Sequence, residues 1–184
     1  QTVEKEPLIP IGHEIACDQF RLPIESPKKA FKTSGPKLTV STNGDNLSAS
    51  SSKVNFVFNR KTGIVTSYKV DGTEYFSEGF GIQPNFWRAP TDNDYGNGMP
   101  KRLQVWKESS KNFNVTDATV TMDGNNAVVN VNYLLPAGNL YIVNYTIYPS
   151  GAVNVAARFT STDMDAAQTE VSEATRTATF TPGP

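Results

Sequence analysis

The chain has 184 residues, of which 38% are hydrophobic and 19% are charged, and its formal net charge is −1. This length is enough for one β-sandwich-sized domain with its own core, plus a fragment of a second domain. The near-neutral charge and the lack of a basic tract leave no electrostatic footprint for nucleic-acid binding. No apolar run has the length of a membrane-spanning helix, and no signal peptide opens the sequence.

The chain contains one histidine, His13, and one cysteine, Cys17. A single cysteine excludes an internal disulfide framework but indicates no compartment. Both residues fall in a segment with partial apolar alternation, residues 12–22, which predicts a strand. We interpret His13 as structural and Cys17 as a small, half-buried apolar residue of that strand.

The N-terminal strand cannot fold alone, so it must pair with another part of this chain or with a further domain. The sequence starts at Gln1 without a methionine, and we expect it to be a piece of a longer protein. Residues 26–36, with two prolines, a glycine and several lysines, predict a linker between domains. We therefore divide the chain into a strand of a preceding domain (1–25), a linker (26–36) and a second domain that is cut short at its end (37–184).

From Lys37 onward the apolar residues alternate with polar ones, and turn residues recur at short intervals. Asp71-Gly72 is one of the strongest short hairpin signals, and Gly63 falls where a turn needs positive φ. We predict an all-β, antiparallel β-sandwich with very little helix, apart from a short helix at 101–107. The expected strands are 38–40, 47–51, 54–58, 64–70, 73–76, 113–122, 127–135, 140–148, 152–160 and, more weakly, 176–180.

The stretch NFWRAPTDNDYGNGMPKRLQVWKE, residues 85–108, places two tryptophans, an arginine and two aspartates around glycines and a proline. An ordinary surface loop needs turn-forming residues without tryptophan or arginine beside them. We interpret the stretch as a shaped polar loop fixed by aromatic anchors at one edge of the sheet. Loops held on rigid scaffolds often carry function.

Asp92 and Asp94 are the candidates for acid–base chemistry. A glycosidase needs carboxylates on opposite sides of a bond, whereas these two lie two positions apart in a tight loop. The favoured interpretation is structural: one of them caps backbone N–H groups and forms a bidentate pair with Arg88. A calcium-loop pattern fails at Gly96 and Asn97, so no metal site and no catalytic residue are assigned.

Trp87 and Trp106 admit two interpretations. Aromatic faces suit the apolar face of a sugar ring, which makes both residues candidates for sugar stacking. Burial in the core is the favoured alternative for each of them.

The stretch around Arg88 also resembles a known family. Its order of residues is similar to the F/T-W/R-R-A-P-x-D-N-D-x-G signature of the C-terminal region of glycoside hydrolase family 2 β-galactosidases. A second match, to a G-H-x-x-A-x-x-Q-F segment that closes the preceding immunoglobulin-like domain, lies in the same order. The matching residues are Arg88, Ala89, Pro90, Asp92, Asn93, Asp94 and Gly96, then Gly12, His13, Ala16, Gln19 and Phe20, and finally Trp106 and Lys107.

The resemblance implies that residues 37–184 form the first part of a galactose-mutarotase-like supersandwich. It also implies an upstream (β/α)₈ barrel that holds the catalytic glutamates, Mg²⁺ and Na⁺ and hydrolyses terminal β-galactosides with retention. The chain itself would then be a non-catalytic scaffold, with no cofactor of its own. Its loop at Arg88, Asp92, Asn93, Asp94 and Gly96 would border the active site.

The implied partners are the barrel and immunoglobulin-like domains of the same polypeptide and β-galactosides, with a homo-oligomer possible in the parent protein. Gly96 and Gly98 would let the loop move. Two further functions stay open from the residues: a stand-alone carbohydrate-binding module that uses Trp87 and nearby aromatics, and an adhesion sandwich without a ligand.

Overall fold

The computed structural model describes residues 8–14, 16–17, 20, 30–77, 80–136, 138–160 and 173–181. The chain divides into two units, Gln1–Ala30 and Phe31–Pro184. In the part of the chain that is described, no helix is long and apolar enough to cross a membrane.

In the first unit, residues 12–14 form a turn and coil instead of the expected strand. Gly12 has a φ of 83°, and the His13 N–H donates to the Pro10 carbonyl at 3.1 Å, which closes the turn. Cys17 is exposed, so the expectation of a half-buried cysteine is wrong. Most of the remaining predicted strand lies outside the described residues, and its place in a preceding domain stays a prediction.

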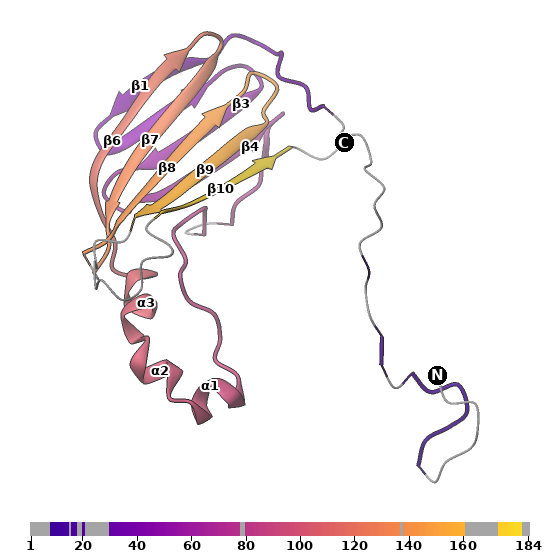
Figure 1. The fold of residues 1–184 in the computed structure, drawn as a ribbon. Helices are drawn as coiled ribbons and strands as arrows, with labels where there is room; N and C mark the ends of the chain where they lie inside the picture. The colour runs from indigo at the N-terminus through magenta and orange to yellow at the C-terminus, as the bar shows by residue number, and fades with distance from the viewer. Residues whose placement is uncertain are drawn as a thin grey trace. The chain divides into compact units, whose positions relative to one another are not determined.

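The second unit contains two antiparallel sheets that lie one over the other (Figure 1). Among the described residues, each sheet has five strands in sequence order, joined mainly by tight turns. The first sheet consists of β1 (Thr39–Asn43), β2 (Asn46–Ser50), β3 (Val54–Asn59), β4 (Ile64–Val70) and β5 (Thr73–Glu74). The second consists of β6 (Asn114–Asp123), β7 (Asn126–Leu134), β8 (Leu140–Ile147), β9 (Val153–Thr160) and β10 (Glu173–Phe180).

The antiparallel β-sandwich predicted from the alternation is therefore confirmed. Side chains alternate across each strand, so every second residue of β3 and β7 faces the other sheet and is buried. Phe56 of β3 packs on Tyr145 of β8, with ring centroids 5.6 Å apart. The fully buried side chains from both sheets form one core, which includes Leu47, Val54, Phe56, Phe58, Val65, Val129, Val131, Tyr133, Tyr145 and Ile147.

Two tyrosines join the sheets by hydrogen bonds across the core. The Tyr133 hydroxyl on β7 donates to the Gly63 carbonyl at 2.9 Å, and the Tyr68 hydroxyl on β4 donates to the Gly151 carbonyl at 2.5 Å. Both acceptors lie in the turns of the opposite sheet. These bonds satisfy hydroxyl groups that would otherwise be costly to bury.

The turns follow the predicted chemistry. Asp71 and Gly72 have φ angles of 50° and 82°, as a two-residue hairpin with positive φ at both positions requires. Gly63 has a φ of 71°, and a Cβ at this position would lie 2.7 Å from the Phe113 side chain. Gly63 is therefore required both by the turn and by the packing of the two sheets.

Part of the predicted linker packs onto the sandwich. Phe31 meets Tyr148 edge-on, with centroids 5.2 Å apart. A Cβ on Gly35 would lie 2.1 Å from the Pro149 carbonyl oxygen, so two backbones cross there. Residues 31–36 therefore belong to the second unit. The rest of the predicted linker, residues 26–29, lies outside the described residues, and its assignment stays a prediction.

Candidate functional site

The segment between β5 and β6 leaves one end of the sandwich and carries the helices of the second unit (Figure 1). We call residues 87–109 the arm. It contains α1 (Asp92–Gly96), α2 (Met99–Arg102) and α3 (Gln104–Ser109). The loop predicted at 85–108 is thus partly helical, and the helix expected at 101–107 is divided at Leu103, whose ψ is 20°.

The base of the arm is fixed by aromatic packing, as the sequence predicted. Phe86 lies 5.1 Å from Tyr141 of β8 and 6.1 Å from Phe159 of β9, measured between ring centroids. Trp106 lies 5.7 Å from Phe159. The Phe86 N–H donates to the Ser110 hydroxyl at 2.6 Å, which ties the two ends of the arm together.

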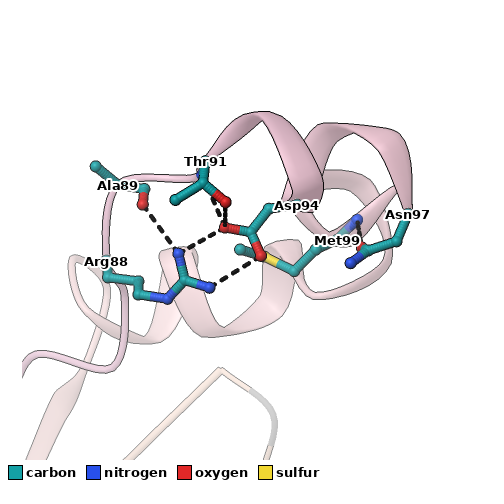
Figure 2. Close-up of polar contacts among 6 residues, drawn as sticks. All are labelled: Arg88, Ala89, Thr91, Asp94, Asn97 and Met99. Atoms are coloured by element: carbon teal, nitrogen blue, oxygen red, sulfur yellow. Dashed lines mark hydrogen bonds and ion pairs between the residues drawn. The ribbon is translucent and has the colours of Figure 1, made fainter. Parts of the chain in front are cut away.

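The arm carries an ion pair with bidentate geometry, shown in Figure 2. Arg88 donates to both carboxylate oxygens of Asp94, from Nη1 to Oδ2 at 2.5 Å and from Nη2 to Oδ1 at 2.9 Å. The Thr91 N–H and hydroxyl donate to Oδ2 at 2.7 and 2.9 Å. Thr91 and Asp94 thus occupy the N-cap and third positions of a capping box that starts α1. We call Arg88, Thr91 and Asp94 the clasp.

The clasp is asymmetric in its exposure. The Asp94 side chain is 11% exposed, whereas the Arg88 side chain is 64% exposed and lies on the surface. Hydrogen bonds from Arg88 and from the Thr91 backbone hold the pKa of the Asp94 carboxyl well below its ordinary value. Asp94 is therefore a permanently ionised structural carboxylate at neutral pH.

The other predicted site residues lie near the clasp without joining it. Asp92, Asn93 and Gly96 are exposed on α1, and Trp87 is half-buried. The prediction left open which aspartate pairs with Arg88, and the structure places Asp94 in that role. Asn97, which was not predicted as a site residue, accepts from the Met99 N–H at 2.9 Å and shapes the turn into α2 (Figure 2).

The sequence contained a signal for α1 that the prediction of a loop did not use. Thr91 and Asp94 are three residues apart and match the [ST]-x-x-[DE] capping pattern. No apolar run follows this pattern in the sequence, and α1 itself has only five residues. Among the described residues, no group of three or more histidine, cysteine, aspartate or glutamate side chains is placed to hold a metal ion.

Comparison with known proteins decides the family. The family model of the β-galactosidase small chain matches residues 50–179, which include the strands β3 to β9, most of β10 and the whole arm. The chain belongs to the β-galactosidase small-chain family. The clasp and the aromatic base of the arm therefore lie inside the region that defines the family.

Individual proteins that are similar to the chain carry names that agree with the family match. The chain is 34% identical to a β-galactosidase of Priestia megaterium over 146 residues, which cover 78% of this chain and 14% of that protein. It is 29% identical to a β-galactosidase of Kluyveromyces lactis over 147 residues, 74% of this chain and 14% of that protein. It is also 27% identical to a β-galactosidase small subunit of Latilactobacillus sakei over 129 residues, 56% of this chain and 39% of that subunit.

Proposed function

We propose that this chain is a non-catalytic β-sandwich part of a β-galactosidase that hydrolyses terminal β-D-galactosides with retention. In this proposal the sandwich is a scaffold, and the arm borders an active site that another domain supplies. An upstream barrel would hold the catalytic glutamates, Mg²⁺ and Na⁺, and it and the immunoglobulin-like domain would be the partners. The family match and the named relatives support the association with β-galactosidases.

The state of Asp94 carries the non-catalytic part of the proposal. A retaining glycosidase needs one carboxyl group that stays protonated as a general acid, with a raised pKa, and a second as nucleophile. The pKa of Asp94 is lowered instead, and both of its oxygens accept hydrogen bonds from the clasp. Asp94 is thus unsuited to donate a proton or to attack a sugar.

A chimera of the Priestia megaterium β-galactosidase tests the role of the arm. The segment of that enzyme that aligns with this chain is replaced by the corresponding residues of this chain, and hydrolysis of a chromogenic β-galactoside is measured. We expect the chimera to be active and the purified chain alone to be inactive. A second chimera, in which residues 92–102 are replaced by a glycine-serine linker, should lose most of kcat/KM.

The thermal midpoint of both chimeras is the control for folding. If the chimera with the glycine-serine linker in place of residues 92–102 folds and keeps full kcat/KM, the proposed role of the arm is wrong. Turnover by the purified chain alone would overturn the non-catalytic assignment.

A further inference from the structure

A surface hollow of about 360 Å³ lies at the base of the arm and is lined by Phe86, Trp106 and Phe159. The three rings come from the segment before α1, from α3 and from β9, and each is half-buried. The hollow is separate from the clasp, whose hydrogen bonds involve none of these side chains.

The lining of the hollow is held in place by ring packing and by a backbone hydrogen bond. Its rings lie 5.7 to 6.2 Å apart between centroids, at angles of 49° to 61°, so each ring restrains the other two. Tyr141 packs edge-on against Phe86 from the core at 5.1 Å, and the Ser110 hydroxyl holds the Phe86 backbone. A rigid lining loses little conformational entropy when a ligand binds.

We propose that this hollow binds one pyranose ring of a neutral β-galactoside through the apolar face of the sugar. The choice of a galactoside rests on the proposed function. Among the described residues, the lining is aromatic and carries no charged side chain, which suits a neutral ligand with a flat apolar face. The volume is at the lower end of the range for small-molecule sites and suits a single ring.

A second apolar cavity has a mixed lining of aromatic and aliphatic side chains. It is lined by Phe56, Tyr68, Tyr75, Phe76, Ile82, Val153 and Thr181. The aliphatic side chains of Ile82 and Val153 lie among the aromatic rings of that cavity. In the part of the chain that the structure describes, only aromatic side chains line the hollow at Trp106. The hollow lies beside the arm that the proposed function places at an active site. Because few polar groups line it, we expect weak, millimolar binding by the isolated chain.

The test uses the full 184-residue chain and methyl β-D-galactoside. The chain has two tryptophans, so the Trp87→Phe variant makes Trp106 the single fluorescent reporter. We expect a saturable change in Trp106 emission with a millimolar midpoint. Adding Phe159→Ala should weaken binding at least tenfold, whereas adding Tyr95→Ala, at an exposed aromatic outside the hollow, should leave it unchanged.

Circular dichroism confirms that each variant is folded before the titration is interpreted. No saturable change at the solubility limit of the sugar would overturn the proposal and would indicate that polypeptide covers the hollow. Equal binding by the Phe159→Ala variant would also overturn it, because the sugar would then bind elsewhere. The two proposals fail separately, since a chain that binds no sugar can still restore activity in the chimera.

Discussion

At the scale of single residues, the clasp shows how one carboxylate is committed to structure. Asp94 accepts from the Arg88 guanidinium and from both donors of Thr91, while Asp92, two positions earlier, is exposed. The sequence showed two equivalent aspartates beside an arginine. The helical turn of α1 breaks the equivalence, because the third residue of a helix points back toward the N-cap.

Asp94→Asn should destabilise the chain at neutral pH, and Asp92→Asn should not. The lowered pKa of Asp94 means that its stabilisation is fully present above the ordinary carboxyl pKa of about 3.9 and is lost as the pH falls further. Urea unfolding across acidic pH measures this. We expect the stability difference between wild type and Asp94→Asn to shrink below about pH 4. A difference that stays constant with pH would show that the Asp94 charge does not contribute.

At the scale of elements, the strands were predictable because two local signals agreed. Period-two alternation placed β3, β4 and the strands β6 to β9 within a residue or two of their observed ends, and turn residues separated them. The weaker prediction at 176–180 is confirmed as part of β10, which pairs with β9 from Glu173 to Phe180. Thr and Ala in β10 give a low apolar contrast, and only pairing with β9 makes its length evident.

The helices of the arm were harder to predict because they are short. Each has six or fewer residues, so none carries the apolar periodicity from which helices are recognised. The hollow could not be predicted from the sequence either. Trp106 was a candidate for sugar stacking, but its ring partner Phe159 is brought to it by the pairing of strands far along the chain.

Alanine substitutions at two glycines compare the contribution to stability of the turn between β3 and β4 with that of the arm. Gly63→Ala should destabilise by roughly 1–3 kcal/mol, because a side chain there has a strained positive φ and meets Phe113. Gly96 has no atom within 4 Å of an added Cβ and ends a helix, so Gly96→Ala should be neutral or slightly stabilising. Thermal unfolding of both variants measures the difference. Equal losses would contradict the assigned geometry of the Gly63 turn.

At the scale of the whole second unit, the two sheets are joined through buried tyrosines. Burial raises the pKa of Tyr68 to about 12, helped by the nearby Tyr75 charge, and it also raises the pKa values of Tyr133 and Tyr145. Ionisation of these three hydroxyl groups is therefore less favourable in the folded chain than in the unfolded chain. The contribution of these tyrosines to stability is therefore greatest in the pH range in which tyrosine is protonated.

The chain should lose stability as the pH rises above about 10. Tyrosines of the unfolded chain ionise near this pH, while those of the folded chain resist, so the stabilisation is complete below about pH 10 and falls above it. Guanidinium unfolding between neutral pH and about pH 11 measures the slope. Tyr133→Phe should lower stability at neutral pH by about 1 kcal/mol, through the lost bond to Gly63, and should make the alkaline slope shallower. An unchanged slope would mean that Tyr133 ionises equally in both states.

The order of the strands has a consequence for how the family can vary. Each sheet is built from strands that follow one another along the chain, and the arm lies in the segment that leads from β5 to β6. Doubling the length of a flexible loop costs only about 0.6 kcal/mol in closure entropy, so a loop inserted between the helices of the arm would cost the sandwich little stability. Insertions and deletions in the arm can therefore accumulate while the sandwich keeps its topology. The length of the arm is thus independent of the strand order in both sheets.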